Sequence, residues 1–389
     1  LTAEKVLKRN LSVLPVFSVF TYPFACVPIL YFLMRDRGMD KSQFAVLQAI
    51  YYIGMALFEL PTGWLADRLG RKIPMVLGPI LLSAGFSVIY LATGFRDFAA
   101  GQLLFAFGHA TLSGPPSALL FESLLHTEWH GDYLRQESRM STWRSLGTGL
   151  SFLGGGLCGH FLGLAAVVLL TSILCLVAAG AALFLAEPTD SGPARSMPGP
   201  RLHERLGSVF RKPGVRWLLL YYVLLFFLLR YGFHTLQPWL ESAQSEGPLF
   251  VGLLTFLFTF IALPFTRFAH RIRDALGEGR VLALMPLLVS LAFVGLSLGT
   301  STELLFFFLF LQIPFGLHWP IIHSYANHRI PSQDRALVLS ILSFSGRIGF
   351  AAVFPLVFHR GSMVVDDYLH VGAVTLVLAL FVGKLRPRS

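Results

Sequence analysis

The residues best suited to chemistry lie in one ten-residue segment, 63–72, which reads Gly-Trp-Leu-Ala-Asp-Arg-Leu-Gly-Arg-Lys and separates two long apolar stretches. Its charges and glycines predict a tight turn at which charged groups meet. Asp67 is suited to the N-terminus of a helix, where free amide groups and the helix dipole favour an anion. Gly70 permits the turn, and Gly63 allows its helix to approach a neighbouring helix closely.

The cations of this segment, Arg68, Arg71 and Lys72, can bind acids or lipid phosphates. Glu122, which ends a later apolar stretch, is the natural partner of Arg71. The alternative is that the cations only anchor the turn to anionic lipid, a role that would not require Asp67.

A second group of candidates consists of ionisable residues inside apolar stretches, each of which costs about 2.5–3.5 kcal/mol on insertion scales. Arg230 is followed one helical turn later by His234, and Arg347 lies in the middle of another stretch. Carboxylates there are limited to Glu59 and Glu122, both near the ends of their stretches. Because a guanidinium in a low-dielectric site recruits a carboxylate or phosphate, the pattern favours an anionic or zwitterionic amphiphilic ligand.

Structural roles remain open for the same residues. Arg230 could bind backbone carbonyls or Glu59, and Arg347 is weighted towards a structural role. Histidines in apolar stretches, at positions 109, 160, 318 and 323, are often hydrogen-bond donors rather than proton carriers. For proton coupling the candidates are Glu59, which precedes the helix-weakening Pro61, and His109, since histidine titrates near neutral pH. The sequence does not choose between them.

The elements that position these residues follow from composition. The chain of 389 residues is 54% hydrophobic and 13% charged, against about 25% charged in soluble domains. A membrane-crossing helix needs about 20 apolar residues. The sequence therefore predicts an all-α integral membrane protein with twelve transmembrane helices, near 10–33, 43–66, 74–94, 98–121, 142–164, 166–186, 216–240, 248–270, 281–300, 303–326, 336–358 and 364–385.

Between the sixth and seventh stretches, residues 187–215 are rich in proline, glycine and basic residues and predict a cytoplasmic linker. Its part from Leu202 to Phe210 could form a short amphipathic helix on the membrane. The predicted halves are 1–186 and 216–389. Most of the 31 lysines and arginines fall on the side of the N-terminus, which predicts that both termini are cytoplasmic. The net charge of +10 is spread over the ends of the stretches, so it does not indicate nucleic-acid binding.

The halves repeat, because Asp274 and Gly277 follow Asp67 and Gly70 at the same interval, each pair just after the second stretch of its half. The 63–72 pattern closely resembles the loop between helices two and three of the major facilitator superfamily of transporters. That resemblance implies two six-helix halves that rock about a midplane site. It also implies that Asp67 faces the eleventh helix, which starts near Ala336, and that the loop contacts latch the inner face.

In this superfamily the first, fourth, seventh and tenth helices line the central cavity. The resemblance therefore makes substrate-binding candidates of polar residues on or near those stretches, namely Tyr22, His109, Arg230, His234, Gln312 and Trp319. The chain departs from the drug–proton antiporter pattern in two places. Residues 103–109 carry no arginine, and the glycines of 147–159 lack the usual proline.

The sequence thus predicts a secondary transporter for a small amphiphilic, anionic or zwitterionic solute, working as a proton-coupled exporter in a bacterial cytoplasmic membrane, as a monomer. The alternatives are a multidrug antiporter for lipophilic cations and a flippase-like carrier for lysophospholipid. An enzyme is not expected, since no metal-binding, nucleophile or phosphate-loop motif is present. The sequence predicts no cofactor and no metal site.

Overall fold

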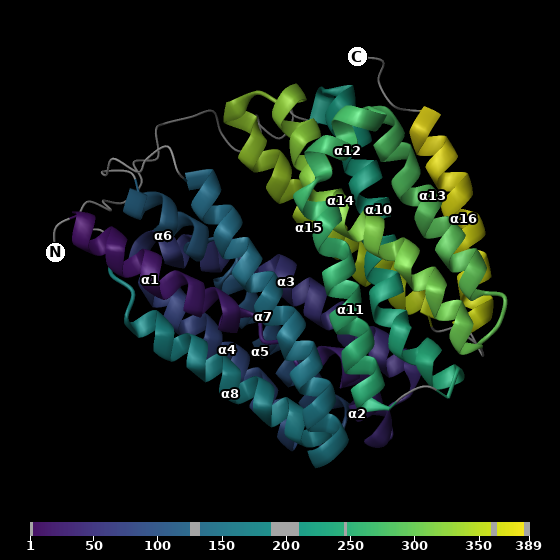
Figure 1. Cartoon of the computed structure of the whole chain (residues 1–389), viewed down its shortest axis with the longest axis horizontal. Coiled ribbons are helices and arrows are strands. Elements are labelled where there is room, and N and C mark those ends of the chain that lie inside the picture. Colours follow the sequence, from purple (N-terminus) through teal and green to yellow (C-terminus); the bar gives the residue numbers. More distant parts are fainter. Residues whose placement is uncertain (1–2, 125–132, 188–209, 245–246, 359–363, 385–389) are drawn as a thin grey trace. The chain divides into compact units, whose positions relative to one another are not determined.

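The computed structural model of the chain describes residues 3–124, 133–187, 210–244, 247–358 and 364–384, and every regular element within them is a helix (Figure 1). The all-α prediction is therefore confirmed for that part of the chain. The chain divides into two compact units. The N-unit contains Leu1–Met197 and Gly247–Phe256, and the C-unit contains Pro198–Glu246 and Leu257–Ser389.

Two groups of helices account for much of the packing in the N-unit. The first helix lies against the seventh and eighth, and the fourth lies between the fifth and eighth. In chain order the helices are α1 (Ala3–Thr21), α2 (Leu30–Asp36), α3 (Lys41–Leu69), α4 (Lys72–Leu91), α5 (Phe95–Thr111), α6 (Pro115–Leu124), α7 (Tyr133–Leu162) and α8 (Leu164–Leu183).

The C-unit repeats this packing with its own helices. Here α13 lies against α14 and α16, as α4 lies against α5 and α8, while α10 pairs with α15 as α1 pairs with α7. The helices are α10 (Pro213–Ser242), α11 (Pro248–Arg267), α12 (Ala269–Leu276), α13 (Glu278–Leu296), α14 (Phe306–Arg329), α15 (Ser332–Phe358) and α16 (Val364–Lys384). The first part of α11 belongs to the N-unit. The repeat indicated by the two loop sequences is thus also a repeat of helix packing.

Among the described residues, nine helical segments are long and apolar enough to cross a membrane. They correspond to α3, α4, α8, α10, α11, α13, α14, α15 and α16. The other three predicted stretches fall on α1 with α2, on α5 with α6, and on α7, which do not meet the same criteria of length and composition. The count of twelve transmembrane helices therefore stays a prediction.

The first predicted stretch, 10–33, is wrong as a single helix. The helix α1 ends at Thr21, and α2 begins only at Leu30 after a short 3-10 turn. Pro23 and Pro28 lie in the interruption. A proline has no N–H to donate and its ring crowds the preceding turn, which explains why the helix stops here.

The fourth predicted stretch, 98–121, is interrupted in the same way. The helix α5 ends at Thr111 and α6 begins at Pro115. The residue before a proline is disfavoured in helical conformation, and Gly114 precedes the pair Pro115-Pro116. Both interruptions lie in the N-unit and turn two predicted rods into four shorter helices.

Several helix boundaries also shift. The helix α10 begins at Pro213, inside the predicted linker, and α15 begins at Ser332, before the predicted start near Ala336. Proline suits the first turn of a helix because its missing N–H would have no partner there. Residues 188–209 of the predicted linker, including most of the predicted amphipathic helix, lie outside the described residues.

Small residues bring α4 and α5 into backbone contact. A Cβ atom on Gly85 would lie 2.9 Å from the carbonyl oxygen of Gly101, and one on Gly108 would lie 2.8 Å from that of Gly78. Glycine at these four positions lets the two helices approach without side chains between them, as is common in membranes.

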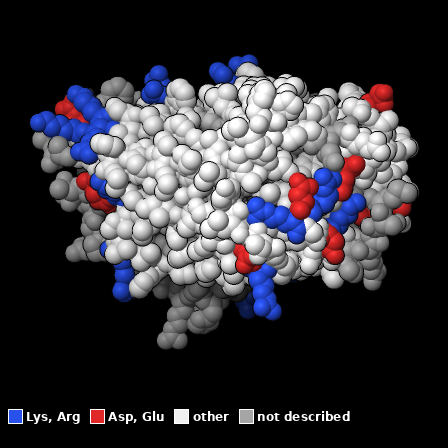
Figure 2. Space-filling model, turned by 90° about the horizontal axis from the view of Figure 1, so that it is seen from below, with Lys and Arg blue, Asp and Glu red and all other residues white. Residues whose placement is uncertain are grey.

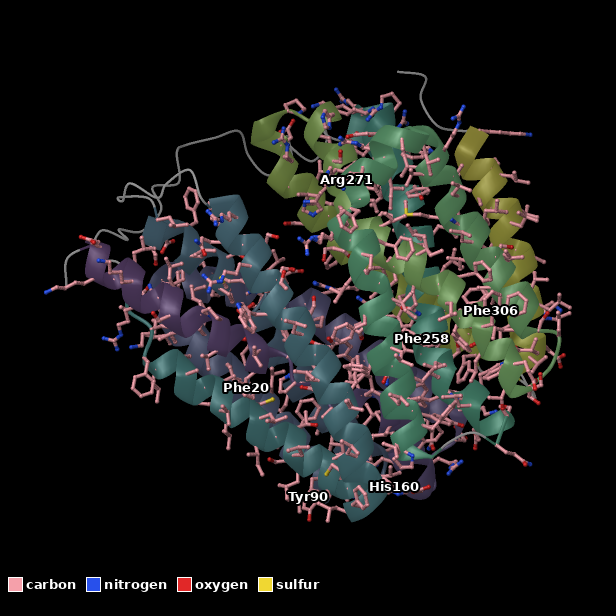
Figure 3. All side chains as sticks on the ribbon, viewed as in Figure 1. Phe20, Tyr90, His160, Phe258, Arg271 and Phe306 are labelled. Atoms are coloured by element: carbon pink, nitrogen blue, oxygen red, sulfur yellow. The ribbon has the colours of Figure 1, made fainter. Side chains whose placement is uncertain are left out.

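The surface agrees with a membrane environment. In the view of Figure 2, charged side chains form a few small groups separated by wide areas of other residues. Aromatic side chains are spread over the helices of both units, among them Phe20, Phe258 and Phe306 (Figure 3). Phe306 is more than half exposed, which suits contact with lipid. His160, at the end of α7, is exposed and packs on the ring of Phe161.

Candidate functional site

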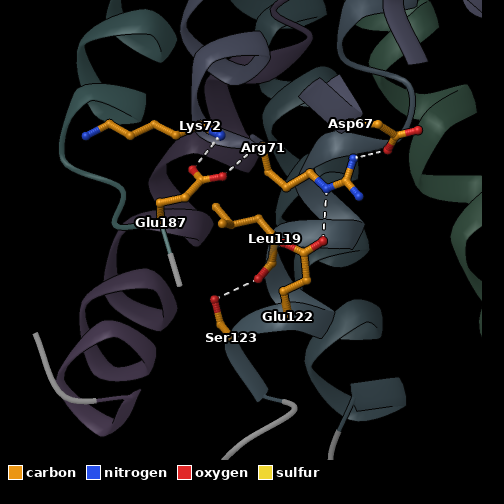
Figure 4. A network of polar contacts seen from close by, with 7 residues as sticks. All are labelled: Asp67, Arg71, Lys72, Leu119, Glu122, Ser123 and Glu187. Atoms are coloured by element: carbon orange, nitrogen blue, oxygen red, sulfur yellow. Dashed lines mark hydrogen bonds and ion pairs between the residues drawn. The ribbon is translucent and has the colours of Figure 1, made fainter. Parts of the chain in front are cut away.

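The turn between α3 and α4 is built around Gly70, whose φ of 83° is a left-handed conformation that favours glycine. Directly beyond it, the backbone N–H groups of Arg71 and Lys72 donate to the two carboxylate oxygens of Glu187, at 2.6 and 2.9 Å (Figure 4). A Cβ atom on Gly70 would collide with this carboxylate. Gly70 therefore both makes the turn and leaves room for an acid at the N-terminus of α4, where free amides and the helix dipole favour it.

The side chain of Arg71 joins two further acids. Its Nε donates to Glu122 Oε1 at 2.9 Å, and its Nη1 donates to Asp67 Oδ1 at 2.7 Å. The predicted partner, Glu122, is thus in place. Partial burial of the guanidinium disfavours its charge, but the hydrogen bonds and charges of the two carboxylates outweigh this and raise the pKa of Arg71 above its ordinary value.

A buried amide extends this network to the first helix. Asn10, on α1, donates to Ser123 Oγ at 2.8 Å and to the Ala186 carbonyl at 2.9 Å, and it accepts from the Ala186 N–H at 2.8 Å. Ser123 in turn donates to the Leu119 carbonyl within α6 (Figure 4). Named polar contacts therefore tie together α1, the turn between α3 and α4, α6 and the segment that follows α8 inside the N-unit.

The remaining residues of the 63–72 segment have smaller roles. Gly63 is exposed and nothing lies within 4 Å of where its Cβ would be, so the prediction that it packs closely on another helix is wrong within this unit. Arg68 lies over the ring of Trp64, with Cζ 4.0 Å from the centroid. The contact of Asp67 with the start of α15 stays a prediction, because that helix belongs to the C-unit.

The corresponding turn of the C-unit has the same backbone and an ion pair of opposite polarity. Gly277 has a φ of 82°, and Glu278 Oε1 lies 2.8 Å from Arg329 Nη1. Gly277, Glu278 and Arg329 follow Gly70, Arg71 and Glu122 by the same interval. An arginine–glutamate pair is thus present in both units, while its two side chains have exchanged places.

Two predicted binding residues meet at the interruptions of the N-unit. The rings of Tyr22 and His109 lie 4.7 Å apart, and His109 Nδ1 is hydrogen-bonded to the hydroxyl of Tyr51 at 2.5 Å. The rings of Phe24 and Phe105 pack around the histidine. Tyr51 comes from α3 and Phe105 and His109 from α5, so two helices and the segment that follows α1 contribute to one aromatic cluster.

In the C-unit, Arg230 is half-buried among aromatic rings. Its Cζ lies 5.4 Å from the ring centroid of Phe226 and 5.8 Å from that of Phe315. His234 is 8% exposed, and the ring of His318 packs on that of Phe315, which Arg230 also contacts. Among the described residues no ion pair joins Arg230 to a carboxylate.

The other candidates have local contacts. Gln312 donates to the Phe308 carbonyl one turn back at 3.1 Å, and Trp319 packs on His323 with centroids 4.2 Å apart. Glu59 and Arg347 are half-buried on α3 and α15. The structure therefore gathers Arg230, His234 and His318 in one unit and Tyr22 and His109 in the other.

Sequence reasoning missed three residues. Glu187 stood at the first position of the predicted linker, and Tyr51 looked like one of many aromatic residues. Arg144 lay inside the predicted stretch 142–164 without being singled out, and it proves to lie on α7 and to line a small cavity. A lone carboxylate directly after an apolar stretch was the one available signal, and it pointed to Glu187.

The comparisons with known proteins decide the family. The family model of the Major Facilitator Superfamily matches residues 14–354 of the chain. The chain belongs to this superfamily. It is therefore a transporter of the major facilitator fold and not an enzyme, as predicted. A segment of 86 residues is 33% identical to the sugar transporter ERD6-like 8 of Arabidopsis thaliana. This segment covers 22% of this chain and 18% of that protein.

Solved structures of other transporters share the fold of this superfamily member. A mutant form of the nucleoside transporter NupG matches with a TM-score of 0.83 and 12% identity over 98% of this chain and 100% of that chain. A mutant form of the peptide transporter POT matches with a TM-score of 0.78 and 14% identity, over 100% of this chain and 98% of that one. At such low identity the likeness concerns the fold.

Proposed function

We propose that this superfamily member carries a small amphiphilic solute with an anionic or zwitterionic group across a bacterial cytoplasmic membrane. It works by alternating access as a proton-coupled exporter, with both termini in the cytoplasm. The turn at Gly70 acts as a latch of the inner face, in which Arg71 joins Asp67 to Glu122. Glu59 and His109 are the candidates for the proton carrier.

The observation that carries the choice of solute is the setting of Arg230. Its guanidinium lies between the rings of Phe226 and Phe315, and the described part of the chain supplies no carboxylate in ion-pair range. Because an arginine away from bulk water gains most from a carboxylate or phosphate, this site favours a solute that brings one. The surrounding rings suit the apolar part of an amphiphile.

Two other functions would require different contacts with the solute. A multidrug antiporter for lipophilic cations would need an acid near the aromatic rings, and a carrier for lysophospholipid would use Arg230 to hold the phosphate. Because the chain shares its fold with nucleoside and peptide transporters and a short segment with a sugar transporter, a nucleoside, a dipeptide and a sugar are tested beside the amphiphiles.

The test is ligand-induced thermal stabilisation of the purified protein in detergent. The panel holds anionic, zwitterionic and cationic amphiphiles, a lysophospholipid, a dipeptide, a nucleoside and a sugar. A ligand that binds only the native state raises the melting temperature. At a ligand concentration of a hundred times its Kd, it adds about 2.7 kcal/mol to the free energy of unfolding. Selective stabilisation by anionic or zwitterionic amphiphiles is expected.

Arg230→Gln removes that effect if the arginine binds the solute, and Arg230→Lys restores it only in part, because lysine lacks the planar fork. The matched control is Arg216→Gln, which removes an exposed arginine from the same helix. Stabilisation by lipophilic cations alone would refute the proposed solute class, as would an unchanged response in Arg230→Gln.

A further inference from the structure

A small polar cavity lies in the N-unit where the two helix interruptions meet α7. It measures about 30 Å³ and is lined by the end of α1, the α5–α6 break and α7. Its walls are Phe17, Ser18, Thr21, Tyr22, Leu112, Ser113, Pro116, Ser117 and Arg144. Four hydroxyl side chains other than tyrosine and one guanidinium are an unusual lining for the inside of a membrane protein, where each polar group needs a partner.

In the described part of the chain, no carboxylate forms an ion pair with the cation of this cavity. Arg144 is half-buried, and the described residues show no ion pair or hydrogen bond to its guanidinium. Ser18, buried to 3% exposure, and Ser113 likewise show no side-chain partner there. These groups are free to donate to an oxyanion.

Two other hydroxyls of the cavity can act as hydrogen-bond acceptors. Ser117 Oγ donates to Glu137 Oε1 at 2.9 Å, and Thr21 Oγ1 donates to the Phe17 carbonyl at 2.5 Å. With their hydrogens engaged, both oxygens present lone pairs. Behind Ser117, Glu137 Oε2 is buried and has no hydrogen-bond partner among the described residues. The cavity therefore combines donors for an anion with acceptors for an N–H or O–H.

Interrupted helices strengthen this reading. Irregular backbone at membrane depth is tolerated where it lines a cavity, and transporters place solute sites at such breaks. Here the ends of α1 and α5 both open at the cavity, one at Thr21 and the other between Thr111 and Pro115. Tyr22, which lines the cavity, also packs on His109.

We propose that this cavity is a subsite for a carboxylate that carries an amino or hydroxyl group on the adjacent carbon. The guanidinium of Arg144 with Ser18 and Ser113 binds the carboxylate, and the oxygens of Ser117 and Thr21 accept from its neighbour. The cavity offers about 30 Å³ to water-sized groups, which favours the smaller carboxylate over a phosphate. The proposal rests on the proposed function, and it gives the carboxylate of the transported solute a second position, at Arg144 in the N-unit, in addition to the one at Arg230 in the C-unit.

Isothermal titration calorimetry of the full chain in detergent tests it with four related probes. L-phenylalanine and phenyllactate carry the carboxylate and the donor, phenylpropionate lacks the donor, and phenylalanine methyl ester lacks the carboxylate. Phenyllactate is expected to bind about 2- to 10-fold more tightly than phenylpropionate, as one added hydrogen bond predicts. The methyl ester is expected to bind at least tenfold more weakly than phenylalanine.

Arg144→Gln is expected to weaken binding of the three carboxylates at least tenfold and to leave the ester unchanged. Ser113→Ala, a mild change at an exposed position, is expected to weaken them about 2- to 10-fold, and it keeps the test valid if Arg144→Gln does not fold. The control is Arg139→Gln, an exposed arginine on the same helix, which should change nothing.

The two proposals fail in distinguishable ways. Unchanged carboxylate affinity in both Arg144→Gln and Ser113→Ala, together with a loss in Arg230→Gln, overturns the subsite and leaves the proposed function intact. Equal affinity for phenyllactate and phenylpropionate overturns the acceptor role of Ser117 and Thr21. If no carboxylate binds the wild-type protein while a cationic probe does, the proposed solute class falls, and the subsite falls with it.

Discussion

The exchanged ion pair of the C-unit allows a sharp test of what the loop contacts contribute. The perturbation is a charge-swap cycle with Glu278→Arg, Arg329→Glu and the double variant. The native pair is 2.8 Å long, with side chains 18% and 34% exposed, respectively. The N-unit shows that the same backbone accepts the other polarity, since there the arginine follows the glycine and the acid lies on the partner helix at 2.9 Å.

The magnitude follows from this partial burial. Exposed pairs contribute about 0–1 kcal/mol, whereas breaking a fully buried pair costs about 3–5 kcal/mol. With Arg329 a third exposed, solvent screening places the loss on single reversal near 2 kcal/mol, which is roughly a 30-fold change in an equilibrium constant. The double variant should recover to within about 0.5 kcal/mol of wild type, because an arginine at 278 would also face Asp274 one turn back, as Arg71 faces Asp67.

The assay is reversible unfolding in detergent mixtures, which gives the free energy of unfolding for all four proteins and hence a coupling energy. With each single reversal costing about 2 kcal/mol and the double variant within about 0.5 kcal/mol of wild type, we expect a coupling energy of about 3.5–4 kcal/mol. Arg280→Glu, a reversal at an exposed arginine next to the pair, is the control and should leave stability within about 0.5 kcal/mol. A coupling below about 0.5 kcal/mol would refute the reasoning that the units use equivalent ion pairs.

Three further outcomes are expected. Gly70→Ala should lower the free energy of unfolding by about 1–3 kcal/mol, because residue 70 has a positive φ and a Cβ atom there would collide with Glu187. The same unfolding assay measures this loss, and unchanged stability would mean that the turn can rearrange. Asp67→Asn should lower the transport rate in proteoliposomes more than substrate affinity, and a pure loss of affinity would contradict the latch. Tyr51→Phe should shift the pH dependence of transport by removing the hydrogen bond to His109, and Tyr90→Phe, at an exposed tyrosine of α4, is the control. An unchanged profile would exclude His109 as proton carrier.

Some features of this transporter follow from the sequence by itself. Long apolar stretches determine an all-helical membrane protein, because backbone polar groups in lipid must be satisfied within each segment. The 63–72 pattern identified the superfamily and the partner of Arg71. These predictions succeed because they rest on local spacing and on charges so rare that few pairings were available.

Other features were decided by tertiary structure. Glu187 reaches the N-terminus of α4 from more than a hundred residues away, and Tyr51 meets His109 across two helices. Arg144 lines a cavity only because the two helix interruptions pack beside α7. Nothing in the spacing along the chain encodes such distances. The sequence determined which groups need partners, and the packing of the helices decided which partners they have.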